Sequence, residues 1–407
     1  MAPIKVGIVG YGFSTKCFHL PYILPNPDLQ VYAFLQRAEA PPKGSGAEAQ
    51  DAHGKMTIRG GHCTVEFPDA KHYRTANEFF GDQAIELVVI CTPNHEEFVK
   101  GALDSGKHVV VEKPFVTTSE GADRLIELAR EKKRVLTVFH NRRFDSDFLT
   151  LKYLLSEGAL GDVRDAQIHF DFPDPSWIGG WTQKEYVPGE GMAFGLGQVP
   201  TYLTASYRSL VPVYRIGSHT IDQALALFGT PSFVTGFFAS NRGVDSDVDD
   251  TFTIVMQYSG NSTSKNLLVT VKTTIITPMR DQLKFFVRGT KGTYLKFGYC
   301  PQEARAIANP GRPAPDDHGV EDERAWGDLI TKVQFDAASQ SFDESTELWT
   351  GKYPSLPGYC RGYYENVVHA IRGSVDVEVR PEMARDGLRV IELARNSHEK
   401  GVKVPWS

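Results

Sequence analysis

Short apolar runs alternate with helical patterns over the first third of the chain, and this alternation predicts a doubly wound parallel sheet. The runs at 86–91 and 108–111 are continuously apolar, as in parallel strands that are covered on both faces. The apolar positions of 120–133 repeat with helical spacing, and Thr117 with Glu120 fits a capping box at the start of this helix. The expected strands are 5–9, 29–35, 86–91, 108–111 and 134–139.

The rest of the chain has a different pattern, because strand candidates follow one another with little helix between them. This order favours antiparallel pairing, with a tight turn at 290–292 between the last two candidates. Two helices are expected at 363–371 and 381–400, the second starting with Pro381 in its first turn. The strand candidates are 163–172, 233–238, 251–258, 267–274, 283–287 and 293–297.

Composition and charge exclude several classes of protein. Hydrophobic residues make up 41% of the 407 residues and charged residues 23%, which is typical of a folded protein. The net charge of −6 argues against a partner that is bulk nucleic acid. No run reaches the roughly 18 apolar residues of a membrane helix, and the first residues lack the apolar region of a signal peptide.

The cysteines and histidines give no recognisable metal motif. The five cysteines are scattered and lack CxxC spacing, so we expect a reducing, cytoplasmic location. Four potential ligands lie close in the sequence, but their spacing fits no common zinc motif, so no metal and no metal-dependent hydrolase is predicted. These are His53, His62, Cys63 and His72.

A glycine-rich turn follows the first expected strand. Gly10 permits a tight turn, and Gly12 lets the backbone approach a pyrophosphate. The third fingerprint position is Thr15 rather than glycine or alanine, so the motif is partial. A helix that starts here, with Phe13, Ser14 and Thr15, would offer amide donors to phosphates. We favour dinucleotide binding over an ordinary strand-to-helix turn.

The end of the second expected strand bears on the choice of cofactor. An NAD-binding unit usually has an acidic residue here for the ribose hydroxyls, whereas arginine accommodates a 2′-phosphate. The chain has Gln36 and Arg37. We therefore predict NADP, with NAD as the alternative if Arg37 is only a solvated surface residue.

Four further motifs, together with the glycine turn, resemble the Gfo/Idh/MocA oxidoreductases, the glucose–fructose oxidoreductase and inositol dehydrogenase type. They are Cys-Thr-Pro-Asn-His at 91–95, Val-Glu-Lys-Pro-Phe at 111–115, Asn-Arg-Arg-Phe-Asp at 141–145 and Gly-Ser-His-Thr-Ile-Asp-Gln at 217–223. The resemblance implies an α/β Rossmann domain followed by an α+β domain with an open, mostly antiparallel sheet. It also implies hydride transfer between NAD(P) and the carbinol or keto carbon of a sugar, polyol or sugar-like, including nucleoside-derived, substrate.

The expected domains follow from this resemblance and from the length of the chain. We place the dinucleotide-binding domain at 1–144 and a substrate and oligomerisation domain at 145–407, with the helix at 381–400 packing back on the first domain. The open sheet implies a homo-oligomer, a dimer or tetramer. Two stretches read as insertions, a mobile surface segment at 38–67 and the segment 198–216.

The resemblance also assigns roles to single residues. It implies that Lys113 polarises or protonates the substrate oxygen and that His219 orients the substrate or acts as acid/base. Arg142 and Arg143 would contact cofactor or substrate, or form a structural ion pair. On the cofactor side the implied contacts are Thr92, Asn94, His95, Glu112, Lys113 and Arg142, and on the substrate side Lys113, Tyr186, His219 and Asp222, with Trp177 and Trp181 near the sugar pocket.

One departure leaves two functions open. Members that catalyse the reaction carry an aspartate four residues before the histidine, where this chain has Arg215, or Gly195 in the other alignment. The segment 198–216 is wedged inside this motif, as an insertion or as a retained intron. We favour an enzyme that uses Lys113 and His219. The alternative is a weakly catalytic NADP-binding regulator similar to the galactose-regulon repressors of yeasts.

Overall fold

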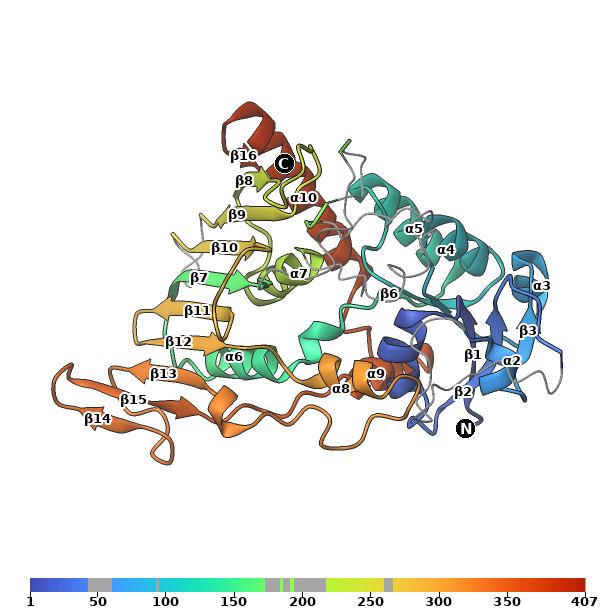
Figure 1. The fold of residues 1–407 in the computed structure, drawn as a ribbon, viewed down its shortest axis with the longest axis horizontal. Coiled ribbons are helices and arrows are strands. Elements are labelled where there is room, and N and C mark those ends of the chain that lie inside the picture. The colour runs from blue at the N-terminus through green and yellow to red at the C-terminus, as the bar shows by residue number, and fades with distance from the viewer. Residues whose placement is uncertain are drawn as a thin grey trace.

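The computed structural model describes residues 1–42, 61–92, 95–172, 184–185, 191–193, 217–259 and 266–406. Within them the chain forms two sheets, one of six strands and one of ten, which lie on opposite sides of Figure 1. The first is built from the N-terminal residues and the second from residues after 162. The expected domain boundary at 144/145 falls between a 3-10 turn, η2 (Asn141–Phe144), and helix α6 (Ser146–Ser156), and it stays a prediction.

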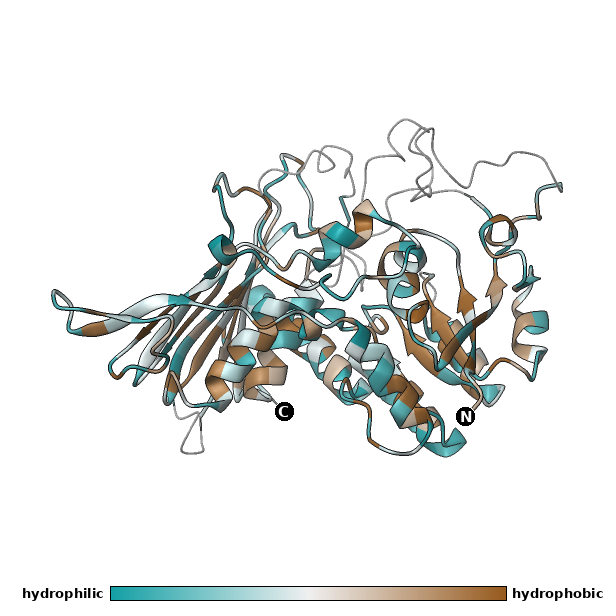
Figure 2. Ribbon diagram, turned by 90° about the horizontal axis from the view of Figure 1, so that it is seen from below, coloured by the Kyte–Doolittle hydropathy of each residue, from teal (hydrophilic) through white to brown (hydrophobic). Residues whose placement is uncertain are grey.

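The six-stranded sheet is entirely parallel, with the strand order β3-β2-β1-β4-β5-β6. Its inner strands are apolar and fully covered, which explains why they read as continuous apolar runs. Figure 2 shows this concentration of apolar residues along the strands. The bounds are β1 (Ile4–Val9), β2 (Leu29–Leu35), β3 (Lys71–Tyr73), β4 (Leu87–Ile90), β5 (His108–Val111) and β6 (Leu136–Val138).

Helices join these strands. The first crossover is a π-helical turn, η1 (Thr15–His19), continued by α1 (Leu20–Ile23). The predicted capping box of α5 (Ser119–Lys132) is wrong by one residue, because Thr118 caps the helix by accepting the amide hydrogen of Gly121. The remaining helices are α2 (Cys63–Glu66), α3 (Ala76–Gly81) and α4 (His95–Asp104).

The ten-stranded sheet is antiparallel except where β7 (Val163–His169) pairs with β10 (Leu268–Thr273) in parallel. Its order is β14-β15-β13-β12-β11-β7-β10-β9-β8-β16. The two predicted features of this region, mostly antiparallel pairing and a turn at 290–292, are confirmed. The other strands are β8 (Phe233–Ala239), β9 (Thr251–Gln257), β11 (Leu283–Gly289), β12 (Gly292–Phe297), β13 (Gly327–Thr331), β14 (Ser341–Asp343), β15 (Leu348–Tyr353) and β16 (Val404–Pro405).

Helices cover one face of this second sheet and connect it to the first (Figures 1 and 2). Helix α7 (Gly217–Phe228) packs on β10 and β7, and α10 (Pro381–Lys400) packs on β8, on α7 and on α5. The side chain of Glu392 in α10 accepts hydrogen bonds from the amide and hydroxyl of Ser119 in α5. The remaining short helices are α8 (Gln302–Ala308), η4 (Glu323–Ala325) and α9 (Arg361–Ile371).

Parts of the fold differ from the sequence prediction. Strands β3, β13, β14, β15 and β16 were not expected, because they are short and do not form continuous apolar runs. The segment predicted as a mobile insertion at 38–67 is anchored at its end, where Cys63 is buried and Glu66 forms a buried ion pair with Lys16 at 3.0 Å. None of the helices in the described ranges is both long and apolar enough to cross a membrane.

The packing of α10 on β8 depends on a glycine. A Cβ atom at Gly236 would lie 2.3 Å from the carbonyl oxygen of Ala394, a backbone atom that cannot rotate away. We expect Gly236→Ala to lower the free energy of unfolding by about 1–3 kcal/mol, as overpacking does, measured by urea denaturation. Gly81→Ala is the matched control, since its Cβ would meet nothing within 4 Å. Equal stability of both variants would show that α10 does not pack this closely.

Candidate active site

The glycine turn follows β1 at the carboxyl edge of the parallel sheet. Gly10 has a φ of +94°, and the backbone amide of Gly10 donates to the carbonyl of Leu35 at the end of β2. The hydroxyl of Thr15, which occupies the third fingerprint position, donates to the carbonyl of Gly10 at 2.9 Å. Thr15 is completely buried. The hydrogen bond from Thr15 to Gly10 therefore stabilises the turn. This explains how the turn forms although its third motif position is threonine rather than glycine or alanine.

The glycine turn leaves its backbone accessible to a ligand. A Cβ atom at Gly12 would meet no atom within 4 Å, so the backbone there faces open space. The hydroxyl oxygen of Thr92, at the end of the neighbouring β4, is buried and has no hydrogen-bond partner among the described residues. An open backbone and an unpaired buried hydroxyl beside the first β-α turn are what a bound pyrophosphate would require.

Two arginines lie at the carboxyl ends of β2 and β3. Arg37 follows β2 and is exposed, and its carbonyl accepts a hydrogen bond from the Nε of Arg74, which follows β3. Sequence reasoning found Arg37 but missed Arg74, because the pairing of β2 with β3 is not visible in the sequence. The side-chain amide of Gln36 donates to the carbonyl of Gly61 and accepts from the amide of Cys63. Gln36 thus supports the segment beside Arg37.

Lys113 follows β5, two strands away from the glycine turn. It is buried, with 8% of its surface exposed, and the peptide bond to Pro114 is cis. The carboxylate of Glu112 accepts the backbone amide hydrogen of Lys113 at 3.1 Å. The Nδ1 of His95, at the start of α4, donates to the carbonyl of Pro114 at 2.6 Å. Residues on both sides of Lys113 are therefore fixed in place.

A histidine that the sequence analysis missed contacts Glu112. His19 lies 3.2 Å from Oε1 of Glu112 through Nε2, and 2.6 Å from the hydroxyl of Tyr364 through Nδ1. Burial disfavours the charged ring, but the neighbouring Cys91 and Glu112 outweigh this effect and raise the pKa of His19 to about 9. The ring is therefore charged at neutral pH and compensates the buried carboxylate. A histidine within the apolar stretch 17–24 was the available signal.

His219 lies in the first turn of α7, on the side of the second sheet. The helix begins at Gly217, so Ser218 lies inside it and does not cap it, and its hydroxyl has no partner among the described side chains and backbone. His219 is buried, and its Nδ1 has no partner in the described part of the chain. Burial, followed by the positive charges of Lys113 and Arg142, moves the pKa of His219 well below its usual value. The ring is neutral and keeps an acceptor or donor nitrogen for a ligand.

Lys284 on β11 also contributes to the field around His219. It is 1% exposed, and its ammonium donates to the side chain of Gln223, one turn after His219 in α7, at 3.0 Å. It also lies 5.2 Å from the ring centre of Phe170. Burial lowers the pKa of Lys284 to about 8. The sequence signal for this residue was a charged side chain inside an apolar strand.

The two arginines of the 141–145 motif have carboxylate partners. Arg143 forms a two-pronged ion pair with Asp222 of α7, at 2.5 and 2.7 Å, and both residues are buried. Arg142 binds Asp145 at 3.1 Å and Glu303 of α8, and lies over the ring of Phe170. Both oxygens of Asp222 are bound to Arg143, and a contact of Asp222 with the substrate stays a prediction. A cofactor contact of Arg142 stays a prediction.

Several predicted site residues lie outside the described residues. These are Asn94, Trp177, Trp181, Tyr186, Gly195, Arg215 and the segment 198–216. The chain on either side is described. The amide of Gly217 donates to the carbonyl of Met192 at 3.0 Å, and a Cβ atom at Gly217 would lie 2.4 Å from the carbonyl oxygen of Ala193. The two flanks of 194–216 are thus in direct contact, as expected for an insertion into a continuous motif.

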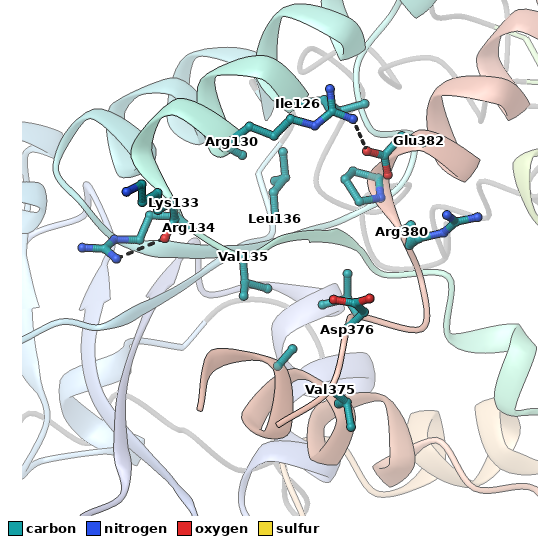
Figure 3. A pocket seen from close by; sticks show the side chains of 14 residues that line it. Ile126, Arg130, Lys133, Arg134, Val135, Leu136, Val375, Asp376, Arg380 and Glu382 are labelled. Carbon is teal, nitrogen blue, oxygen red and sulfur yellow. Dashed lines mark hydrogen bonds and ion pairs between the residues drawn. The ribbon is translucent and has the colours of Figure 1, made fainter. Parts of the chain in front are cut away.

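A separate pocket of about 480 Å³ lies at the other edge of the parallel sheet, where β6 begins (Figure 3). Its walls come from α5 and from the connection between α9 and α10, and include Arg130, Arg134, Arg380 and Glu382. Arg130 and Glu382 form an ion pair across it at 2.8 Å. Because the glycine turn and Lys113 lie at the carboxyl edge, this pocket is not part of the candidate active site.

Comparison with known proteins agrees with the two-sheet fold. Residues 4–140 match the family described as an oxidoreductase family with an NAD-binding Rossmann fold, and residues 148–295 match the GFO/IDH/MocA C-terminal domain. The chain belongs to the Gfo/Idh/MocA oxidoreductases. The predicted family and fold class are confirmed, and the protein is an oxidoreductase with an NAD-binding domain.

Relatives match over nearly the whole chain. An uncharacterized oxidoreductase of Schizosaccharomyces pombe is 31% identical over 411 residues, covering 99% of this chain and 100% of that protein. The scyllo-inositol 2-dehydrogenase (NADP(+)) IolW of Bacillus subtilis is 30% identical over 399 residues, covering 98% of this chain and 94% of that protein. The structure of yvaA from Bacillus subtilis is 29% identical with a TM-score of 0.78, covering 100% of this chain and 99% of that one.

The contribution of the ion pair between Arg143 and Asp222 can be tested by measuring the stability of the protein without it. We expect Asp222→Ala to lower the free energy of unfolding by about 3–5 kcal/mol, because it leaves a buried guanidinium without a partner. Chemical denaturation measures this loss. Asp104→Ala, which breaks the exposed pairs of Asp104 with Lys100 and with Lys132, should cost at most about 1 kcal/mol. If Asp222→Ala is as stable as the wild type and only weakens substrate binding, Asp222 is a substrate ligand after all.

Proposed function

We propose that this oxidoreductase uses NADP(H) to oxidise or reduce a CH–OH or keto carbon of a sugar, polyol or sugar-like molecule. The observation that carries the proposal is the buried Nδ1 of His219, which has no hydrogen-bond partner among the described residues, in a ring whose pKa is lowered by burial and then by the charge of Lys113. One residue comes from the parallel sheet and the other from a helix on the second sheet. A substrate hydroxyl bound between them would receive a hydrogen bond from each side.

The proposed roles of the protein groups follow from their charge. NADP(H) bound at the glycine turn would supply or accept the hydride. Lys113 donates a hydrogen bond or proton to the substrate oxygen during reduction and accepts the proton during oxidation. His219 is neutral, so it accepts or donates a hydrogen bond to a neighbouring hydroxyl without placing a second full charge beside Lys113. Glu112, held by His19 and by the amide of Lys113, positions the lysine.

The choice of NADP rests on the two arginines at the carboxyl ends of β2 and β3. Arg37 and Arg74 are both exposed and adjacent, and the two residues that directly follow β2 are Gln36 and Arg37 rather than an acidic residue for the ribose hydroxyls. Guanidinium groups bind phosphate with two parallel hydrogen bonds. The relative IolW, whose name gives scyllo-inositol and NADP(+), supports both the cofactor and the polyol class of substrate.

The setting of the enzyme is part of the proposal. All five cysteines are free, which fits a reducing cytoplasm. On the face of the second sheet opposite to the helices, Phe237 and Leu268 are 57% and 42% exposed, and Phe297 is also exposed. Such an apolar sheet face favours a homo-oligomer formed through it. Measurement of the mass in solution tests this part.

Lys113→Ala tests the assigned chemistry. We expect turnover to fall by at least about a hundredfold, as loss of a general acid or base does, while the Kd for NADPH changes by only a few fold. Activity is first sought with NADP⁺ and NADPH against inositols, sugars, ketosugars and nucleosides. Lys100→Ala, which changes an exposed lysine of α4, serves as control.

The results of these assays distinguish the proposed enzyme from the alternative, an NADP-binding regulator. Normal turnover by Lys113→Ala would show that another group moves the proton. If the wild type binds NADPH tightly but turns over none of these compounds, the regulator alternative is favoured, because binding and catalysis then separate in the native protein.

Arg37→Ala and Arg74→Ala test the cofactor. We expect each to weaken NADPH binding by about tenfold or more, because each removes a charge-assisted contact to the 2′-phosphate. NADH binding should stay unchanged. Fluorescence titration measures both, with Arg280→Ala, an arginine whose side chain is 94% exposed, as the matched control. Equal binding of NADH and NADPH by the wild type would contradict the proposal.

A further inference from the structure

The fold gathers three potential metal ligands behind the adenosine end of the candidate cofactor site. His62 precedes α2, Cys63 is the first residue of α2, and His72 lies in β3. One donor atom from each of these side chains lies within 4.8 Å of the other two. Their spacing in the sequence gives no sign of this, since the pairing of β3 with β2 and the return of the chain at 61–66 create the cluster.

Backbone carbonyls fix the orientation of both histidines. The Nε2 of His72 lies 2.8 Å from the carbonyl oxygen of Gln36, and the Nε2 of His62 lies 3.2 Å from that of Ala38. A carbonyl oxygen only accepts, so both Nε2 atoms carry the hydrogen and each Nδ1 keeps its lone pair. Histidines that bind metals are held in this way, donating the other ring N–H to a backbone carbonyl or carboxylate.

The two histidines differ in how their Nδ1 atoms are engaged. The Nδ1 of His62 caps α2, accepting from the hydroxyl of Thr64 at 2.8 Å and from its amide at 3.3 Å, so an ion must displace these bonds. No described residue donates to the Nδ1 of His72. The two rings meet edge to face with centroids 4.6 Å apart. Cys63 is 1% exposed and free.

We propose that His62, Cys63 and His72 form a binding site for Zn²⁺. A thiolate and two neutral imidazoles are ligands that zinc prefers, whereas Mg²⁺ and Ca²⁺ require oxygen donors. The donors of a tetrahedral zinc site lie about 3.5 Å from one another, so the three side chains must move together and His62 must exchange its bonds to Thr64 for the ion. The thiol of Cys63 releases its proton to solvent when it binds the ion, and the fourth position is open to water.

The position of this site suggests what the ion does. The carbonyls that hold the two histidines belong to Gln36 and Ala38, the residues on either side of Arg37. The side chain of Gln36 also binds Gly61 and Cys63. An ion bound here would hold the chain around Arg37 in one conformation. This effect on cofactor affinity rests on the proposed function, whereas ion binding itself does not.

Direct titration tests the site. The full chain is treated with a chelator, and Zn²⁺ is then titrated in competition with a chromophoric chelator. We expect one site per chain with a Kd below about 1 µM. Co²⁺ should give the near-ultraviolet absorption of a thiolate-to-cobalt charge transfer. Cys63→Ser should abolish this absorption, and His72→Gln should weaken Zn²⁺ binding by at least about tenfold.

Controls separate a ligand from a structural residue. His369→Gln changes an exposed histidine at the end of α9 and should bind Zn²⁺ like the wild type. Thermal melting with chelator present shows whether each variant is folded. If Cys63→Ser does not fold, the Zn²⁺ affinity of His72→Gln still tests the site. We expect this variant to fold, because His72 is only partly buried and lies on an edge strand.

Two outcomes would overturn the proposal: no stoichiometric binding of Zn²⁺, or wild-type affinity in His72→Gln. The Kd for NADPH with and without Zn²⁺ measures the effect on the cofactor, and a few-fold tighter binding with the ion is expected. Neither titration needs turnover, so a failure to find a substrate would leave the result on the metal site unchanged.

Discussion

The buried ion pair between Arg143 and Asp222 is the interaction on which the candidate active site depends. Arg143 comes directly after the last strand of the parallel sheet, and Asp222 lies one turn after His219 in the helix that covers the second sheet. A two-pronged contact between buried groups fixes both distance and direction, and either charge alone would be costly in the interior. The position of His219 relative to Lys113 is therefore set by a pair of residues that need not touch the substrate.

The site that results is rich in positive charge. Lys113, Arg142 and Lys284 all lower the pKa of His219, and burial does so more strongly still. In relatives that carry an aspartate four residues before this histidine, a carboxylate would oppose these charges. Of the described carboxylates nearby, Asp145 and Asp222 are bound to arginines and Glu112 is bound to His19, while the buried Asp147 acts on Lys284. A substrate oxygen that gains negative charge would be stabilised in such surroundings, whereas a cationic substrate would be disfavoured.

The sequence was sufficient for features that depend on local pattern. The strands 29–35 and 108–111, the helix 381–400, the glycine turn and Lys113 followed from apolar runs and short motifs, and the resemblance supplied the family. Features that depend on tertiary contacts were missed. Arg74, His19 and Lys284 lie at the candidate site because strands and helices distant in sequence meet there. The pairing of Asp222 with Arg143 was not visible either, because the sequence around Asp222 says nothing about a partner from another element.

The contact between Gly217 and residues 192–193 has a further consequence for how this fold can vary. Residue 193 and Gly217 lie side by side, joined by the hydrogen bond from Gly217 to Met192. The position of α7 therefore does not depend on how many residues connect 193 to 217. The length of such a connection can change during evolution at little thermodynamic cost, since loop-closure entropy grows slowly with length. The connection can thus lengthen while the helix that carries His219 keeps its place.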